Sequence, residues 1–482
     1  MIHTIENDYL RVSVDDHGAE LCSIFDKVHN REVIWQADPA YWKRHAPVLF
    51  PNVGRHFEDH YRINGVEYPS SQHGFARDSE FTCVDMTADS ITHRLKSSDA
   101  TRENYPYDFE LKIKHVLEAD GYHVYRGYYD LNYLNSGRFL CHRLPVGATD
   151  NRGTKCDIGY YDLEAMKFHK VADTNAWCWQ QGSRLRWHPI EKNRILFNSI
   201  EGDHYCAKIC DTDGNQIRII DRPLYDVTPD FKYGISLNYS RLQRMRPGYG
   251  YNYFEDETKD VYAPENDGLF LVDLERNESH LIYSLKELAT VIDPAGKCIH
   301  YLNHVSIAPN GKHLIFFHIF VDPNVKGWKT ILYVSDIQGQ ELKALEKTDK
   351  VSHYCWMDDE SLMVTCVKAS GETYYCTYSI KDGEKKSVDI EGLNTDGHPG
   401  RIYGTDVCIT DTYPLGKSRQ KLMSFALDDE KTTTLAFVYH DYRLRGEKRC
   451  DLHPSTADGE RLVSVDTTYQ KKRRSIVIFE RN

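Results

Sequence analysis

The sequence predicts an all-β protein in two unequal parts: a truncated β-sandwich segment over residues 1–118 and a seven-bladed β-propeller over residues 122–482. Helical periodicity is nearly absent, and the best helical stretch is short, at 283–291 (YSLKELATV). Strand signals are frequent, because short runs rich in Val, Ile, Tyr and Phe end at Gly, Asn or Asp. A strand-and-turn phrase also recurs from residue 131 onward, and this repeat predicts the propeller.

In each copy of the phrase, a turn containing Asn, Asp or Gly leads into a short apolar strand. Seven such openings share roughly 350 residues, or about 50 each, a period typical of propeller blades with several short strands. One small sheet cannot bury both of its faces, so we expect the blades to stack radially until the ring closes. The openings lie at 135–140, 192–197, 229–234, 309–314, 359–364, 403–408 and 457–462.

Residues 1–118 do not carry the repeated phrase. They alternate apolar and polar side chains, as an antiparallel sheet with one buried face does. A turn signal at Glu118–Gly121 (EADG) separates this alternating pattern from the repeated strand-and-turn phrase. The domain boundary is therefore predicted at this turn.

Composition excludes several classes of protein. The 482 residues carry 60 Lys and Arg against 72 Asp and Glu, a formal charge of −12, which argues against nucleic acid as a partner. The longest nearly apolar run, at 314–321 (LIFFHIFV), is too short to span a membrane, and the first ten residues show no secretory signal. The 13 cysteines include no CxxC pair, which argues against a disulfide framework or a structural zinc site. A reducing cytoplasm is therefore the expected location.

Four motifs in the first part are similar to the aldose 1-epimerase (mutarotase) family. They are 35–42 (WQADPAYW), 47–55 (PVLFPNVGR), 73–77 (HGFAR) and 105–109 (YPYDF). The resemblance implies a galactose-mutarotase-like sandwich whose sugar site is lined by Arg55, His73 and Arg77. Arg supplies several rigid donors for sugar hydroxyls, and His can hold or move a proton.

The resemblance ends near residue 118, where less than half of the family domain is present. The general acid and the general base of the family lie in the part that is not matched. Ring opening needs a proton donor at the ring oxygen and a base at the anomeric hydroxyl. We therefore expect a truncated sugar-site half that is inactive as a mutarotase.

Seven further phrases lie within residues 122–482, at 175–182, 241–250, 303–304, 351–356, 396–398, 410–414 and 449–454. With these phrases, residues 122–482 resemble propellers related to oligogalacturonate lyase. The resemblance implies a metal held by His side chains near the propeller centre, with His353 and His453 as two ligands and His304 as the catalytic base. Asp451 stands where the family has a further metal His, and Lys448 or Arg449 stands where it has a Gln. His398 is an additional candidate ligand, and such a set suits Mn, Fe or Zn.

Other side chains are candidates for contact with a sugar. Arg244 and Arg246 could clamp a uronate carboxylate, or could belong to a solvated basic loop. Trp179 and Gln181 could form an aromatic wall with amide donors, although Trp is more often core at blade interfaces. The 33 Tyr residues, against 18 Phe, are consistent with a Tyr-rich β protein or with a surface that stacks on sugar rings. Asp411, in the turn at 411–414, is interpreted as structural, capping backbone amides.

Three functions remain open, and they belong to different classes. The first is metal-assisted β-elimination on a uronate-containing oligosaccharide, with His304 as the base and Arg246 as the carboxylate clamp. The second is a non-catalytic propeller that binds a sugar, and a third, weaker alternative is an isomerase activity in the first part. A carbohydrate is the expected ligand in each case, with neither nucleic acid nor membrane as a partner, and the oligomeric state is left open.

Overall fold

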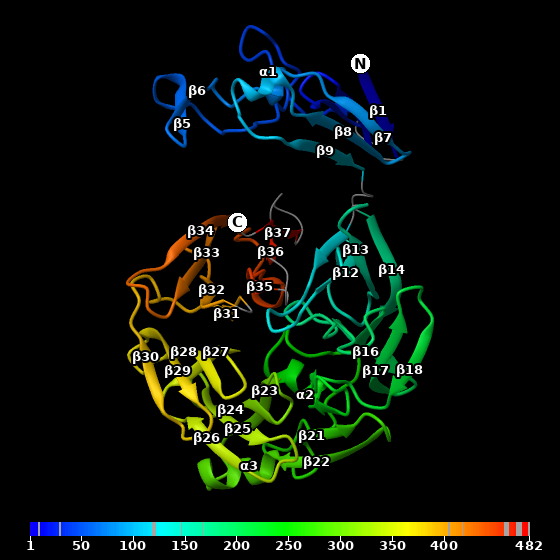
Figure 1. Ribbon diagram of the computed structural model, residues 1–482. Coiled ribbons are helices and arrows are strands. Elements are labelled where there is room, and N and C mark those ends of the chain that lie inside the picture. Colours follow the sequence, from blue (N-terminus) through cyan, green and yellow to red (C-terminus); the bar gives the residue numbers. More distant parts are fainter. Residues whose placement is uncertain are drawn as a thin grey trace. The chain divides into compact units, whose positions relative to one another are not determined.

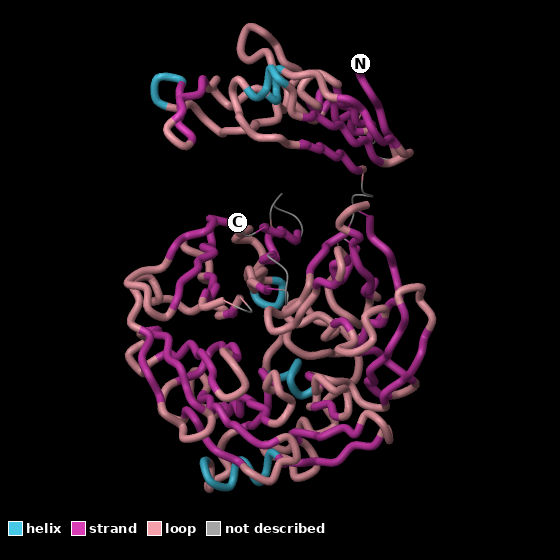
Figure 2. The backbone as a smooth tube through the Cα atoms, viewed as in Figure 1, coloured by secondary structure: helices cyan, strands magenta, loops and turns pink. Residues whose placement is uncertain are grey.

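The computed structural model describes residues 1–7, 10–27, 30–117, 122–145, 147–165, 167–402, 405–416, 418–456, 462–468 and 475–480. They divide into two compact units, Met1–Gly121 and Tyr122–Asn482. Strands dominate both units, so the all-β class is confirmed (Figure 2). None of the helices in the described ranges has the length and hydropathy needed to cross a bilayer. The predicted boundary turn at 118–121 lies outside the described residues.

The described residues of unit 1 form two antiparallel sheets and a separate hairpin. The first sheet has the order β1 (Ile2–Glu6), β2 (Leu10–Asp15), β3 (Glu20–Asp26), β4 (Arg31–Glu32). The second has the order β7 (Thr82–Met86), β8 (Ser90–Lys96), β9 (Glu110–Val116), and β5 (His60–Ile63) pairs with β6 (Val66–Pro69). Short helical turns connect these strands: η1 (Phe57–Asp59), η2 (Ala76–Asp78) and α1 (Asp99–Arg102).

The two sheets of unit 1 share one small core. Ile5, Val12 and Val14 of the first sheet pack with Ile91 of the second, and all four are buried. These residues alternate with exposed or half-buried ones along their strands, as expected for sheets with one buried face. Unit 1 is therefore a small sandwich.

Unit 2 consists of consecutive antiparallel sheets, most of them with four strands in chain order. Figure 1 shows the sheets arranged around a common centre, with β23, β27, β31 and β35 toward the centre and β14, β18, β22, β26, β30 and β34 at the periphery. The first three sheets are β10 (Tyr122–Tyr125), β11 (Leu134–Asn135), β12 (Arg138–Pro145), β13 (Cys156–Asp162), β14 (Lys167–Thr174); β15 (Arg186–Trp187), β16 (Arg194–Glu201), β17 (His204–Asp211), β18 (Gln216–Ile220); and β19 (Asp226–Val227), β20 (Tyr233–Ser236), β21 (Gly268–Asp273), β22 (Glu278–Ser284). The next four are β23 (Ile299–Ile307), β24 (His313–Val321), β25 (Lys329–Asp336), β26 (Leu342–Glu346); β27 (Lys350–Trp356), β28 (Ser361–Val367), β29 (Thr373–Ser379), β30 (Lys385–Val388); β31 (Gly400–Arg401), β32 (Val407–Asp411), β33 (Arg419–Ala426), β34 (Thr433–Tyr439); and β35 (Ser455–Thr456), β36 (Leu462–Thr467), β37 (Ser475–Glu480).

The repeated phrase of the sequence corresponds to one turn in each sheet of unit 2. Each opening leads from a central strand into the strand beside it: β12, β16, β20, β24, β28, β32 or β36. Gly311, in the fourth opening, has φ +74°, a left-handed conformation that glycine adopts without a steric cost. Residues 403–404 and 457–461 of the last two openings lie outside the described residues.

In the part of unit 2 that the structure describes, two helices and one helical turn interrupt the strands. Helix α3 (Leu285–Ile292) confirms the predicted helix near 283–291, and Ser284 caps it together with Glu287. Helix α2 (Tyr239–Met245), capped by Asn238, occupies the segment considered as a basic loop, so that interpretation is wrong. The turn η3 (Gly446–Lys448) precedes the last sheet.

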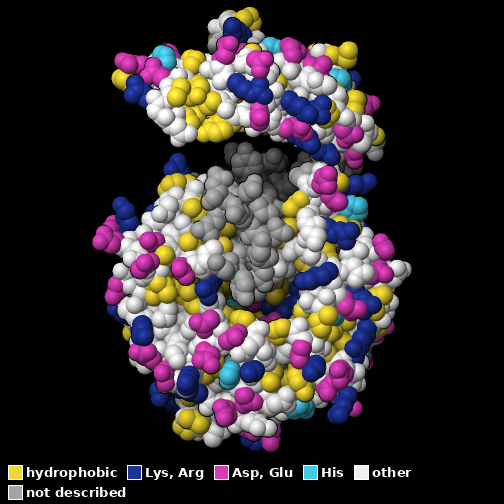
Figure 3. All heavy atoms as spheres, viewed as in Figure 1, with side chains coloured by type: hydrophobic (Ala, Val, Ile, Leu, Met, Phe, Trp, Pro, Cys, Tyr) yellow, Lys and Arg dark blue, Asp and Glu magenta, His cyan; other side chains and the backbone are white. Residues whose placement is uncertain are grey.

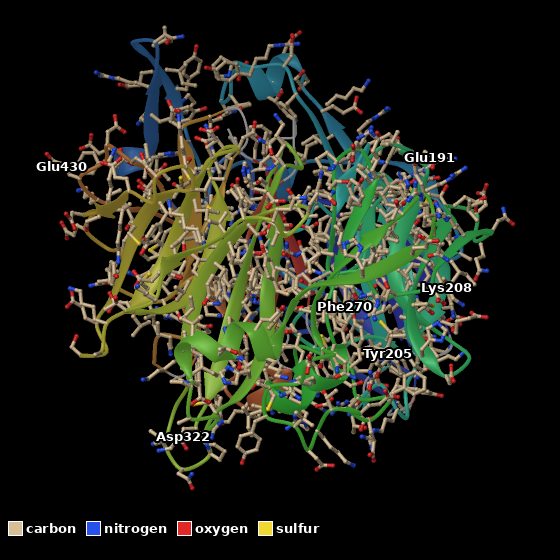
Figure 4. The ribbon with its side chains drawn as sticks, turned by 90° about the horizontal axis from the view of Figure 1, so that it is seen from below. Glu191, Tyr205, Lys208, Phe270, Asp322 and Glu430 are labelled. Carbon is tan, nitrogen blue, oxygen red and sulfur yellow. The ribbon has the colours of Figure 1, made fainter. Side chains whose placement is uncertain are left out.

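The surface of unit 2 is mixed in charge. On the face seen in Figure 3, Lys and Arg side chains are interspersed with Asp and Glu. In the view from below, Asp322 and Glu430 lie at the outer margin of the sheets (Figure 4). The largest core cluster of unit 2 lies further in and is built mainly from Tyr, Leu, Ile, Phe and Val.

Candidate functional site

Four histidines from neighbouring sheets meet at the centre of unit 2. His304 lies on β23 and His353 on β27, whereas His398 and His453 lie just before β31 and β35. The ring centroids are 6.1 Å apart for His304 and His353, 4.0 Å for His353 and His398, and 4.4 Å for His398 and His453. All four side chains are buried. The structure thus brings the predicted histidines into one cluster.

Three of these imidazoles are held through Nδ1. The Nδ1 atom of His353 is 3.1 Å from Oδ1 of Asp396, and that of His398 is 2.9 Å from Oδ1 of Asp411. Nδ1 of His453 is 3.2 Å from the carbonyl oxygen of Gly127. Such contacts fix the orientation of each ring. The Nε2 atom of His398 is buried without a hydrogen-bond partner among the described residues.

Asp451 completes the cluster. His398, Asp451 and His453 each offer a donor atom that lies within 4.8 Å of the other two. Arg449 also binds Asp451, with Nε 2.8 Å from Oδ1 and Nη2 2.6 Å from Oδ2. Asp451 and Arg449 therefore form an ion pair, and the arginine compensates the charge of the carboxylate. Lys448, the alternative position, instead donates to the carbonyl of Ala148.

The neighbouring carboxylates set the charge state of His398. Burial lowers the pKa of His398, but Asp411, followed by Asp451 and Asp396, outweighs burial, so the net shift is upward. Gly397 allows the close approach to Asp411, because a Cβ atom there would lie 2.1 Å from the Asp411 carbonyl oxygen. A cluster of imidazoles with one carboxylate could hold Mn, Fe or Zn.

His304 is oriented by a backbone irregularity. Its φ is +51°, and the pairing of β23 with β24 shifts between Asn303 and Ser306. Such a bulge re-aims a side chain, here toward Tyr128, whose ring stacks 5.2 Å from that of His304. The Nδ1 atom of His304 is buried without a partner in the described part of the chain. Burial, and then the charges of His353 and Arg246, lower the pKa of His304 well below its usual value, so the ring is neutral.

Gln181 positions His304 indirectly, and its amide nitrogen is used in hydrogen bonds within the protein. Its Nε2 donates to Tyr225 Oη at 2.7 Å and to Asn303 Oδ1 at 3.2 Å. The backbone N–H of His304 donates to the same Tyr225 oxygen at 3.1 Å. Gln181 is therefore a positioning residue, which corrects the prediction of direct sugar contact through its amide nitrogen.

The two predicted arginines behave differently. Arg246 lies 5.0 Å above the ring of Tyr249, and that ring is 5.9 Å from the ring of His304. Arg244 points elsewhere, because its Nε donates to Asp256 at 2.8 Å. The structure thus brings Arg246 close to the cluster and corrects the assignment of Arg244.

Trp179 is a core residue and not part of a sugar-binding wall. It is 4% exposed and packs against Trp177 with ring centroids 5.4 Å apart. Its Nε1 donates to the carbonyl of Thr149 at 3.3 Å. The alternative interpretation, a Trp in a core between sheets, is the one that the structure supports.

The sequence reasoning missed several residues that surround the histidines. Tyr129 lies 5.2 Å from the ring of His398, and Tyr413 lies 5.8 Å from it. Asp396 and Asp411 act as the carboxylate partners described above. The available signals were the excess of Tyr and the motifs 396–398 and 410–414, which contain these carboxylates. Asp411 also accepts backbone N–H groups, as interpreted, but its contact with a ligand-type histidine was not anticipated.

In unit 1 the predicted sugar-site motifs lie side by side. A bridge pairs Phe50 with Gly74, and the backbone N–H of Gly54 donates to His73 Nδ1 at 2.9 Å. Arg55 forms two hydrogen bonds of 2.5 Å with the exposed carboxylate of Asp59. Arg77 lies 3.5 Å from Asp78. The motif segments therefore come together, with both arginines paired to neighbouring carboxylates.

Comparison with known proteins supports part of this description. Residues 1–128 match the model of the aldose 1-epimerase family, ten residues beyond the predicted end of the resemblance. The N-terminal part is mutarotase-like. The plasmid and chromosomal LacX proteins of Lactococcus lactis subsp. lactis are 37% and 36% identical to it over 120 residues, which are 24% of this chain and 40% of each LacX protein. The chain thus spans about 40% of the length of these curated relatives.

The similar solved structures include a mutarotase-related enzyme and two proteins of other kinds. A galactose mutarotase related enzyme from Lactobacillus acidophilus is 25% identical, with a TM-score of 0.24, covering 44% of this chain and 73% of that one. TolB from Acinetobacter baumannii is 15% identical, with a TM-score of 0.37, covering 70% of this chain and 75% of that one. A GH74 enzyme from Niastella koreensis is 12% identical, with a TM-score of 0.41, covering 66% of this chain and 46% of that one. These scores are too low to support an argument about function.

Proposed function

We propose that unit 2 is a closed seven-bladed propeller whose central histidines bind a divalent metal and a uronate-containing sugar, and that it cleaves the sugar by β-elimination. One observation carries this proposal. Three histidines from different sheets are each held through Nδ1, and a fourth, His304, lies beside them as a neutral imidazole. The first three resemble metal ligands with their outer partners, and the fourth has the properties of a base.

Contacts between the first and last sheets support closure of the ring. Strand β10 lies beside β37. After β10, the buried Arg126 donates through Nη2 to the carbonyl of Leu452 at 3.1 Å, and its backbone N–H donates to Asp466 at 3.2 Å. The Ser455 hydroxyl donates to the carbonyl of Leu131 at 2.9 Å. These bonds join segments more than 300 residues apart, as closure of a propeller requires.

The donor set fits a divalent transition metal. His398 and His453 would supply imidazole nitrogens and Asp451 an oxygen, because their donor atoms lie within 4.8 Å of one another. His353, whose ring centroid is 4.0 Å from that of His398, would be a further ligand. A bound ion would act as a Lewis acid on the uronate carboxylate. Arg449 also reduces the negative charge of the site, and this favours the binding of an anionic sugar.

His304 would remove the proton from the carbon next to the uronate carboxylate. The released electron pair forms a double bond to the neighbouring carbon, and the bond from that carbon to the glycosidic oxygen breaks. The leaving oxygen takes up a proton. Arg246, close to His304 through Tyr249, would hold the carboxylate and so position that carbon. A His304 that burial keeps neutral at neutral pH has a lone pair for this step.

A second function is favoured by the Arg449–Asp451 ion pair. Because Arg449 already donates to both oxygens of Asp451, the site could bind a sugar acid without metal and without turnover. Such a propeller would be a carbohydrate-binding module. The two functions make different predictions for metal content and for product formation.

The test combines metal analysis with an assay of oligouronide cleavage. The purified chain is incubated with Mn²⁺, dialysed and analysed, and cleavage is followed by the ultraviolet absorbance of unsaturated uronates. We expect one metal in the central site and an activity that His304→Gln abolishes while sugar binding persists. His318→Gln, a buried histidine that pairs with His300 on the same sheet, is the control and should leave both unchanged. Sugar binding without metal or product would support the binding module, and the absence of sugar binding would overturn both.

A further inference from the structure

A second group of metal-ligating side chains lies in unit 1, apart from the central site of unit 2. His3, Cys83 and His93 each offer a ligand atom, and these atoms all lie within 4.8 Å of one another. His93 is fully buried, and the other two are half-buried. None of the three belongs to the sugar-site motifs of the mutarotase-like part.

Strand register explains why these side chains meet. Cys83 on β7 and His93 on β8 are direct cross-strand partners, so their side chains lie on the same face. His93 shares its face with the buried Ile91, because side chains two apart on a strand point the same way. On β1, His3 likewise shares its face with the buried Ile5. All three therefore project into the interior between the two sheets.

Asp16 lies between the two histidines. Its Oδ1 is 2.9 Å from Nε2 of His3 and 3.1 Å from Nε2 of His93. Its Oδ2 is 3.2 Å from the amino group of Met1.

The distances from Asp16 Oδ1 to the two imidazole Nε2 atoms are those of hydrogen bonds. Two imidazoles can both donate to a single carboxylate oxygen only when each carries a proton on Nε2. A divalent cation could replace these protons, since thiolate and neutral imidazole are metal ligands only when deprotonated.

We propose that unit 1 binds Zn²⁺ through His3, Cys83 and His93, with Asp16 as the fourth ligand. One sulfur, two imidazoles and a carboxylate form a tetrahedral set that zinc accepts, with bonds of about 2.0–2.3 Å. The ion joins the two sheets of a unit whose shared core is small, so its role is structural. The proposal does not depend on the function of unit 2.

The visible spectrum of bound Co²⁺ distinguishes this site from the central site of unit 2. In the described part of unit 2, the cluster that could hold a metal contains His and Asp but no Cys, so a thiolate-to-cobalt charge-transfer band reports on unit 1 alone. Titration of the full chain with Co²⁺ should produce this band, and Zn²⁺ should displace it. His398→Gln, in the central site, should leave it unchanged.

The variants Cys83→Ser and His3→Gln decide the proposal. Cys83→Ser should abolish the band and remove one equivalent of zinc from the chain. His3→Gln, at a half-buried position that tolerates a polar side chain, should weaken Co²⁺ binding at least tenfold and alter the visible spectrum. Cys22→Ser, at another half-buried cysteine of the same unit, is the control and should keep the full band. A wild-type chain without the band, or a band that survives Cys83→Ser, would overturn the proposal.

Discussion

The carboxylate of Asp411 contacts His398 in two ways: Oδ1 is 2.9 Å from the imidazole Nδ1 and 2.7 Å from the backbone nitrogen. Its Oδ2 also accepts the backbone N–H of His453 at 3.2 Å. One buried carboxylate therefore positions two of the histidines proposed as metal ligands, although neither is its neighbour in sequence. This relationship makes the geometry of the site sensitive to a residue that need not touch the metal.

Asp411→Asn should weaken metal binding without removing a ligand. The amide is similar in size but has one acceptor oxygen, so it cannot make all three contacts. We expect a 10–100-fold lower affinity for Mn²⁺ or Zn²⁺ at the central site, measured by competition with a chelating dye. Asp267→Asn, an equally buried carboxylate bound to Asn238, is the control and should not change the affinity. Equal losses in both variants would show a general effect on folding.

Glu346 should make stability depend on pH between about 4.5 and 2. Burial alone would raise its pKa, but Lys385, Tyr378 and two backbone N–H groups lower it to about 2. A depressed carboxyl pKa stabilises the folded state above the unfolded value of 4.5, and this stabilisation is lost as the pH falls toward 2. Glu346→Gln should therefore lower the free energy of unfolding by on the order of 3 kcal/mol at pH 7, and by much less near pH 3. Urea titrations at both pH values measure this, and Glu384→Gln, on the exposed turn before β30, should change little.

The fragment 122–482 should fold without unit 1. The two units form separate clusters of contacts, and each has its own hydrophobic core. We expect the fragment to be soluble and to unfold cooperatively, as followed by near-ultraviolet circular dichroism. Aggregation of the fragment, under conditions in which the full chain is soluble, would contradict this prediction.

Mutarotation by unit 1 should be absent. The chain spans about 40% of the length of the LacX proteins that it matches. A general acid and a general base together contribute several powers of ten in rate, and the resemblance places both in the part that is not matched. Polarimetry on freshly dissolved galactose, glucose and their 6-phosphates should show no rate above that of buffer. A protein-dependent rate that His73→Ala removes would place an active site in this unit.

Much of the architecture could be predicted because it depends on local chemistry. In the described openings, the turn before the second strand contains Asn, Asp or Gly, residues that tight turns favour. The positions of His304, His353, His398 and His453 beside such strands were therefore recognisable as related positions in separate sheets. The cap formed by Ser284 and Glu287 is likewise a contact between near neighbours, and the helix that it begins was anticipated.

Only the tertiary structure decided which of these side chains share an environment. Trp179 and Arg244 have the same residue types as many ligand-binding side chains, yet one packs in a core and the other is bound to Asp256. The contact of His353 with Asp396, 43 residues away, and the cluster of His3, Cys83 and His93 in unit 1 bring together distant strands. The physical reason is that burial, charge compensation and hydrogen-bond partners are supplied by neighbouring sheets. Local sequence specifies a strand and its turns, whereas the side chains that face it depend on how the sheets pack.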